Sequence, residues 1–324
     1  MTENQPVIPD VSLVQQFHEN LKENIHKVII GYDSLIDVLS AAVLTGGHIL
    51  LEGVPGTAKT TICRMFADFI GGKFGRLQGA VDVQPADILG FTVYSKEGAT
   101  SDFRKGPIFS NIFLIDEINR LTPKTQSALI EPLAERQVTY DSVSYPLPKP
   151  FLTVASQNPY ENAGGTFTLI DAQADRFAYS VVLTQLDREA ELAVLDREID
   201  GALPSDEPKT PSKEINIDID ALRSAVKEVH VSPEIRGYIA DIIMATRKHG
   251  DVSLGSSTRG SIALLRGAQV IAAINGRGYV IPDDVKYIAP YTLRHRLFLK
   301  NEAVLNGVTQ MRVLETILNT VTVR

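Results

Sequence analysis

Short apolar runs alternate with amphipathic helical patterns over the first part of the chain. Three runs are typical of buried strands: HILLEG at 48–53, NIFLIDEI at 111–118 and FLTVASQNP at 151–159. Apolar positions spaced for one face of a helix occur at 13–26, 33–47, 61–72 and 123–137. Strands that alternate with helices predict an α/β fold, in which a parallel sheet is covered by helices on both faces.

Two segments interrupt this alternation. FTVYSKEGATSDF (91–103) and QVTYDSVSYPL (137–147) alternate around polar turns and predict β-hairpins. The polar, proline-bearing stretch 201–214 predicts a linker, and the patterns beyond it are helical only. The sequence therefore predicts an α/β core at 1–200, a linker and a smaller all-helical domain at 215–324.

The chain has 324 residues and a formal net charge of −7, which is unevenly distributed. Residues 1–211 carry 28 acidic and 17 basic side chains, which disfavours broad nucleic-acid binding because phosphate contacts need clustered cations. No apolar stretch reaches the roughly 18 residues of a membrane span, and the first residues do not resemble a secretion signal. The single cysteine, Cys63, excludes an internal disulfide, so we expect a cytoplasmic protein.

Residues 53–60, GVPGTAKT, match most of the phosphate-binding pattern G-x-x-x-x-G-K-[ST] and directly follow a predicted strand. In such loops backbone N–H groups face the anion, the lysine reaches the β- and γ-phosphates, and the next hydroxyl holds Mg²⁺. Those two positions are Lys59 and Thr60, although a chance glycine-containing loop is the alternative for this stretch alone. The expected nucleotide-binding residues are Gly53, Val54, Pro55, Gly56, Thr57, Ala58, Lys59, Thr60 and Thr61.

Ala58 stands where the pattern has its second glycine. It adds only a methyl group, and alanine readily takes helical backbone angles. A glycine would be required only if this position had a positive φ angle or touched phosphate through bare backbone. We therefore expect the loop to retain its function.

Asp116 and Glu117 end the second predicted strand, at the sheet edge where open α/β proteins bind their ligands. One carboxylate can hold Mg²⁺ and its neighbour can polarise an attacking water molecule. The alternative is that Asp116 caps the following helix. A phosphate loop on a neighbouring strand favours the metal and catalytic interpretation.

Six motifs together resemble those of the MoxR family of AAA+ ATPases: GVPGTAKT, FLIDEINR, PKTQSALIEPLAERQVT, ASQNP, DRF and RHRL. The resemblance extends from IIGYDSL to RHRL, nearly the whole chain, and alanine before the lysine is common in the family's phosphate loop. It implies an AAA+ P-loop core with a helical lid, which binds ATP and Mg²⁺ and hydrolyses ATP.

The resemblance also implies roles for individual residues. Thr60 and Asp116 would organise Mg²⁺, and Glu117 would be the catalytic base. Asn158, at the end of the third predicted strand, resembles the sensor that positions water or contacts the γ-phosphate. An ordinary Asn-Pro turn is the alternative for Asn158.

Two arginines resemble further catalytic groups of the family. Arg176 resembles the arginine finger that a neighbouring subunit supplies, and a surface arginine beside an aspartate is the alternative. Arg259 resembles the lid sensor, an arginine at the start of a helix that contacts the phosphates. Ile30 and Gly31 resemble the segment that lines the adenine pocket, although core packing would also explain the isoleucine.

Three functions remain open at this point. The resemblance favours an ATP-hydrolysing ring, with six subunits expected, that remodels client complexes together with a partner bearing a von Willebrand factor A domain. An ATP-dependent assembly switch with little turnover is the alternative, which Glu117 and Arg176 disfavour because a switch needs neither. A nucleic-acid translocase is disfavoured by the acidic core and by the lack of an aromatic-basic stripe.

Overall fold

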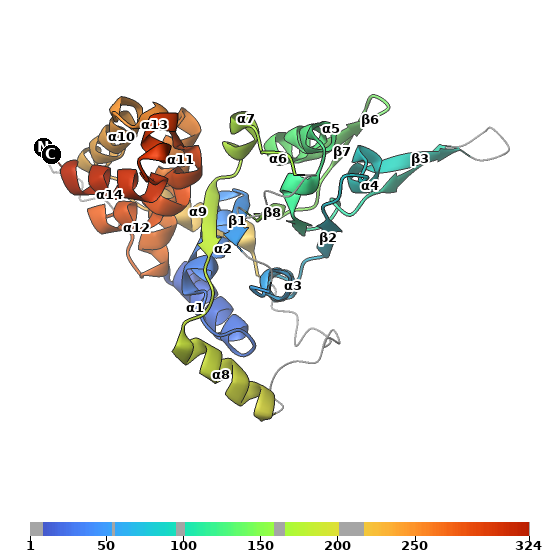
Figure 1. Ribbon diagram of the computed structural model, residues 1–324. Coiled ribbons are helices and arrows are strands. Elements are labelled where there is room, and N and C mark those ends of the chain that lie inside the picture. The colour runs from blue at the N-terminus through green and yellow to red at the C-terminus, as the bar shows by residue number, and fades with distance from the viewer. Residues whose placement is uncertain (1–8, 54–55, 95–100, 159–165, 201–216, 324) are drawn as a thin grey trace, which may run out of the picture.

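The computed structural model describes residues 9–53, 56–94, 101–158, 166–200 and 217–323 (Figure 1). Within these residues five parallel strands form a central sheet in the order β2-β5-β8-β1-β9. The strands are β1 Ile49–Gly53, β2 Phe74–Gln78, β5 Ile112–Asp116, β8 Leu152–Gln157 and β9 Tyr179–Leu183. The predicted parallel sheet is therefore confirmed, and the three predicted strands are its three inner members. The expectation that the phosphate loop and the acid pair follow neighbouring strands is wrong, because β8 lies between β1 and β5.

The inner strands are apolar because successive side chains enter two different cores. Ile49 and Leu51 of β1 belong to a core that includes three helices, α1 Ser12–His26, α2 Asp33–Thr45 and α3 Lys59–Phe69. Leu50 belongs to a second core on the opposite face, beneath the segment around Leu129. Helices consequently cover both faces, as the alternation of strands and helices predicted.

The edge strands β2 and β9 were not identified from the sequence. In β2 only Gly75 is buried, and Arg76 and Gln78 are exposed, so an apolar run is missing. In β9 most side chains are buried, and the run YSVVL is a signal that the sequence analysis overlooked. The pattern of β2 is weak because few of its side chains face a core, which does not apply to β9.

The predicted helix over 123–137 is two short helices, α5 Pro123–Ala128 and α6 Ile130–Glu135. Pro132 explains the break, because its nitrogen has no hydrogen to donate to the carbonyl of Ala128 four residues earlier. The apolar spacing continues through both helices, which is why the sequence suggested one element.

Both predicted hairpins are present. β3 Gly90–Tyr94 pairs antiparallel with β4 Ser101–Lys105, and β6 Gln137–Tyr140 pairs antiparallel with β7 Val143–Pro146. The β6–β7 turn has positive φ angles of 47° at Asp141 and 63° at Ser142, as a tight two-residue hairpin loop requires. The hairpins touch, since Phe103 stacks on Tyr145 with ring centroids 4.3 Å apart, and they lie opposite the C-terminal helices (Figure 1).

The C-terminal region is helical, as predicted, with one short antiparallel pair added, β10 Val252–Leu254 and β11 Phe298–Leu299. Its helices are α9 Ile219–Glu228, α10 Pro233–Lys248, α11 Thr258–Ile274, α12 Pro282–Leu293, α13 Asn301–Leu305 and α14 Gln310–Thr320. Before it, α8 Arg188–Ile199 lies beside α1 (Figure 1). The predicted linker, 201–214, lies outside the described residues, so the division into two domains stays a prediction.

A membrane-crossing helix, which would have to be both long and apolar, is not found in the part of the chain that the structure describes.

The RHRL motif joins the helical region to the sheet. Arg294 forms an ion pair with Glu52 of β1 at 2.9 Å and donates to the Ser180 hydroxyl of β9 at 2.9 Å. The His295 ring Nε2 lies 2.8 Å from the Phe177 carbonyl, just before β9. These contacts tie the orientation of the helical region to the sheet edge at β9.

His48 precedes β1 and is buried. Its Nδ1 accepts the backbone N–H of Thr153 at 3.0 Å, so Nε2 carries the proton and donates to the Leu133 carbonyl at 2.9 Å. Burial lowers the pKa of His48 from 6.5 to about 4, since the charged ring would lose its hydration. The folded chain therefore holds this histidine neutral.

We expect His48 to make folding stability depend on pH. Its folded pKa is below its unfolded pKa, so the unfolded chain takes up the proton first as the solution is acidified. The contribution of neutral His48 to the free energy of unfolding is about 3 kcal/mol. This contribution is complete above pH 6.5 and is lost as the pH falls toward 4. Denaturant unfolding at pH 7 and pH 4.5 measures it.

The variant His48→Gln should show a smaller loss of unfolding free energy between these pH values than the wild type. His230→Gln, at an exposed position, is the matched control and should behave like the wild type. An equal loss in the wild type and in His48→Gln would contradict the prediction.

Candidate functional site

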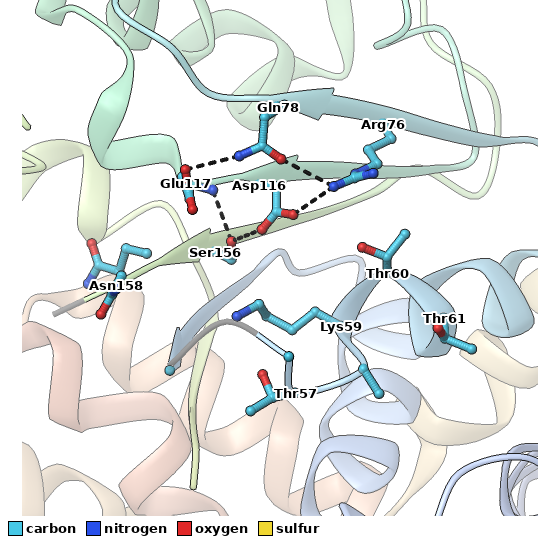
Figure 2. A pocket seen from close by; sticks show the side chains of 14 residues that line it. Thr57, Lys59, Thr60, Thr61, Arg76, Gln78, Asp116, Glu117, Ser156 and Asn158 are labelled. Atoms are coloured by element: carbon cyan, nitrogen blue, oxygen red, sulfur yellow. Dashed lines mark hydrogen bonds and ion pairs between the residues drawn. The ribbon is translucent and has the colours of Figure 1, made fainter. Parts of the chain in front are cut away.

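The carboxyl ends of the inner strands border a cleft of about 410 Å³ (Figure 2). Most of the sequence-predicted residues line it, from the phosphate loop, from the end of β5 and from the end of β8. The lining residues are Gly53, Gly56, Thr57, Ala58, Lys59, Thr60, Thr61, Arg76, Gln78, Asp116, Glu117, Ser156, Gln157 and Asn158. This volume lies within the ~300–1,000 Å³ range of small-molecule sites. Val54 and Pro55 lie outside the described residues.

The phosphate loop leads from β1 into α3, which begins at Lys59. Gly53 must lack a side chain, because a Cβ there would lie 2.7 Å from the backbone oxygen of Leu183 on β9. The N-terminus of α3 borders the cleft, so the N–H groups of its first turn and its dipole favour a bound anion.

Ala58 corrects one sequence-based expectation. Its φ angle is 51° and its ψ angle is 17°, which is left-handed and not helical as assumed. A residue with a Cβ pays about 1–2 kcal/mol in this conformation. The position therefore has the geometry for which the usual pattern places glycine, and alanine occupies it at a cost.

The Lys59 side chain extends from the start of α3 toward the acid pair (Figure 2). Burial lowers the pKa of the Lys59 amine, and the charges of Asp116 and Glu117 oppose that change. A polyphosphate in the cleft would add negative charge beside the amine and favour its protonated form further. Lys59 is thus suited to bind an anion.

Asp116 and Glu117 are held by Ser156 of β8. The Ser156 hydroxyl donates to Asp116 Oδ1 at 2.6 Å and accepts the backbone N–H of Glu117 at 3.0 Å. Glu117 has φ 58° and ψ 56°, a left-handed conformation that turns the chain sharply after the strand. Glu117 takes the N-cap position of the next 3-10 helix, so the capping alternative does not apply to Asp116. Strained backbone of this kind is often found at functional sites.

Two residues of β2 contact the acid pair and were missed by the sequence analysis. Arg76 Nη2 lies 3.1 Å from Asp116 Oδ2, and Gln78 Nε2 donates to Glu117 Oε2 at 3.0 Å (Figure 2). Because they are two residues apart on a strand, they point to the same face. The sequence GRLQ shows Arg76 and Gln78 at alternate positions. Only the pairing of β2 with β5 shows that both side chains lie beside the acid pair.

The described residues contain no cluster of three or more His, Cys, Asp and Glu side chains able to enclose a metal ion. Mg²⁺ does not need one, because it commonly takes one or two carboxylates and completes its coordination with phosphate oxygens and water. The Asp116 carboxylate and the Thr60 hydroxyl line the same cleft and fit this limited role.

The remaining predicted residues lie outside this cleft. Arg176 donates to the Ala172 carbonyl at 2.5 Å, and Arg259 pairs with Asp175 at 3.3 Å. Ile30 is partly buried, and Gly31 has a φ angle of 76°. Only Asn158 of the predicted sensors reaches the cleft, at the end of β8.

The fold and the cleft define a P-loop nucleotide-binding protein of the AAA+ class. Residues 48–179 match the model of the ATPase family associated with various cellular activities, and residues 244–317 match an AAA lid domain. A solved protein from Cytophaga hutchinsonii, described as a candidate ATPase, has a TM-score of 0.86 and 37% identity, covering 97% of both chains.

Two relatives indicate which family within the AAA+ class the chain belongs to. The uncharacterized protein YeaC of Bacillus subtilis is 41% identical over 93% of both chains. Chaperone MoxR1 of Mycobacterium tuberculosis is 35% identical over 92% of this chain and 80% of its own length. The chain belongs to the MoxR family of AAA+ ATPases.

We expect Ala58→Gly to raise the free energy of unfolding by up to about 1 kcal/mol. Glycine removes the left-handed strain at this position but increases the entropy of the unfolded chain, which offsets part of the gain. Ala240→Gly, at an exposed position within α10, is the matched control and should lower stability by roughly 1 kcal/mol. Urea unfolding would disprove the prediction if both substitutions destabilised equally.

Proposed function

We propose that this chain hydrolyses ATP to ADP and phosphate with Mg²⁺ and thereby remodels or matures a client protein complex in the cytoplasm. Its family resemblance supports a homo-oligomeric ring, hexameric in our proposal, and a partner with a von Willebrand factor A domain. The observation that carries the proposal is that Lys59 and Thr60 face Asp116 and Glu117 across one cleft. The name of the M. tuberculosis relative, a chaperone, supports the kind of work proposed.

The phosphate loop would bind the triphosphate. Lys59 would contact the β- and γ-phosphates, while backbone N–H groups at the start of α3 would donate to phosphate oxygens. Thr60 and Asp116 would hold Mg²⁺, which neutralises charge that develops on the phosphates. Charge stabilisation by fixed groups is usually the largest contribution to such a reaction.

Glu117 would orient the attacking water. Its position is fixed by its backbone conformation, by Gln78, and by Arg120, whose Nη1 lies 3.1 Å from Glu117 Oε2. Asn158 lines the same cleft and can donate to phosphate and accept from water. These groups favour turnover over a switch that binds ATP and does little else.

Arg176 would act on the nucleotide of the next subunit. It does not line the cleft of its own chain, which supports action on a neighbouring subunit's nucleotide in an assembly. An arginine supplied in this way can accelerate phosphoryl transfer by about 10³-fold or more. The proposal therefore links hydrolysis to ring formation.

Glu117→Gln should lower the turnover number by about 10²-fold or more, because the amide cannot accept a proton from water. Its affinity for ATP should stay close to that of the wild type, since the phosphate loop is intact. Single-turnover hydrolysis and equilibrium ATP binding measure the two effects. Glu228→Gln, on the exposed end of α9, is the control, and an unchanged rate in Glu117→Gln would favour the assembly switch.

Mixing two inactive variants tests whether Arg176 acts on the cleft of a neighbouring subunit. Lys59→Ala removes the phosphate contact but keeps Arg176, whereas Arg176→Ala keeps the cleft. We expect each variant alone to be nearly inactive and the mixture to recover part of the wild-type turnover. No recovery, together with wild-type turnover strictly proportional to protein concentration, would contradict an arginine supplied by a neighbour.

A further inference from the structure

Asp175, the residue before Arg176, accepts hydrogen bonds from three side chains of the helical region. Its Oδ1 accepts from Ser257 Oγ at 2.8 Å and from Arg296 Nε at 2.9 Å, and its Oδ2 accepts from Arg259 Nη1 at 3.3 Å. The core residue next to the proposed arginine finger is thus bound by the residue that resembles the lid sensor.

The two arginines that share this carboxylate differ in how firmly they are held. The Arg296 side chain is only 3% exposed and also donates to the backbone oxygens of Asp175, Phe177 and Ala178. The Arg259 side chain is 58% exposed and has one longer contact to the carboxylate. Exposed pairs of this kind contribute little to stability, so Arg259 can exchange Asp175 for a stronger anion.

Ser257 connects the start of α11 to the same carboxylate. Its hydroxyl caps the helix by accepting the backbone N–H of Arg259 at 3.2 Å, and it donates to Asp175. A movement of Arg259 toward the cleft would move the first turn of α11 and with it this hydroxyl. Asp175 would then lose or change two of its three donors.

The segment that carries Arg176 is bound on both sides by the helical region. Asp175 precedes Arg176 and Phe177 follows it, and the backbone oxygens of both accept from Arg296. Within the described residues, the buried Nε of Arg176 has no hydrogen-bond partner, and its Nη1 donates to the Ala172 carbonyl of the same segment, so the position of its guanidinium depends on this segment. A change at Asp175 therefore acts on the backbone of Arg176 directly.

We propose that Asp175 is a positioning residue that holds Arg259 outside the cleft. When a nucleotide binds, Arg259 leaves Asp175 and binds a phosphate. Nucleotide binding in a subunit thereby repositions that subunit's own Arg176. This inference rests on the proposed function. It adds that the sensor and the finger of one chain are coupled through a shared carboxylate. Such coupling is reciprocal, so the state of Asp175 also changes the affinity for nucleotide.

A double-mutant cycle on ATP affinity tests the proposal. Asp175→Asn removes the competing charge and should tighten binding of a non-hydrolysable ATP analogue by about five-fold or more, while kcat falls. In the Arg259→Ala background the same substitution should leave the affinity unchanged within about two-fold. An equal gain in both backgrounds, or none in the first, would overturn the proposal.

Asp175→Asn could fail to fold, because it leaves the buried Arg296 without its counter-charge. A second measurement avoids this substitution. Amide hydrogen exchange of residues 171–178 should change when the ATP analogue binds to the wild type and to Arg236→Ala, an exposed lid control, but not when it binds to Arg259→Ala. The same change in Arg259→Ala would sink the idea.

The outcomes distinguish this inference from the proposed function. A wild-type chain that neither binds nor hydrolyses ATP would refute both. A wild type that hydrolyses ATP normally, with affinities that show no coupling between Asp175 and Arg259, would refute only the role of Asp175.

Discussion

A parallel sheet forces the carboxyl ends of its strands to one edge, and the whole site depends on that constraint. The phosphate loop follows β1, the acid pair ends β5, and Ser156 and Asn158 lie at the end of β8, although long stretches of chain separate them. The resulting cleft brings the partly buried amine of Lys59 and the guanidinium of Arg76 near two carboxylates. Neither sign of charge dominates, so the cleft suits an anion that arrives with a cation, as a metal-bound triphosphate does.

Backbone strain occurs at two positions beside the cleft, at the start of α3 and just after β5. Ala58 and Glu117 both have left-handed angles, and each directly flanks a residue or group expected to contact the ligand. The Ser156 hydroxyl stabilises the second turn by accepting the Glu117 N–H, while it also donates to Asp116. A single hydroxyl therefore fixes the relative positions of both acids. Removal of this hydroxyl would disturb the proposed metal binding and the proposed water activation together, since both acids share one support.

The sequence predicted those features that depend on local pattern. Inner strands such as β5 are buried on both faces, so their apolar runs stand out, and the phosphate loop and the acid pair have fixed spacing. Edge strand β2 has no such run, and the roles of Arg76 and Gln78 follow from its pairing with β5, which no local pattern encodes. The predicted backbone conformation of Ala58 was wrong for a similar reason. The loop, and not the helix propensity of alanine, sets its φ angle.

The junction between the sheet and the helical region shows why separate motifs have to be considered together. Arg176 and Arg259 are far apart in sequence, and each resembles a catalytic group by itself. In the structure Arg259 binds the carboxylate of Asp175, the residue directly before Arg176, and the buried Arg296 anchors the same carboxylate. A buried guanidinium with this many acceptors resists movement, whereas an exposed one with a single weak contact does not. The contrast supports our proposal that Arg259 is the side chain that moves and that the segment around Asp175 responds.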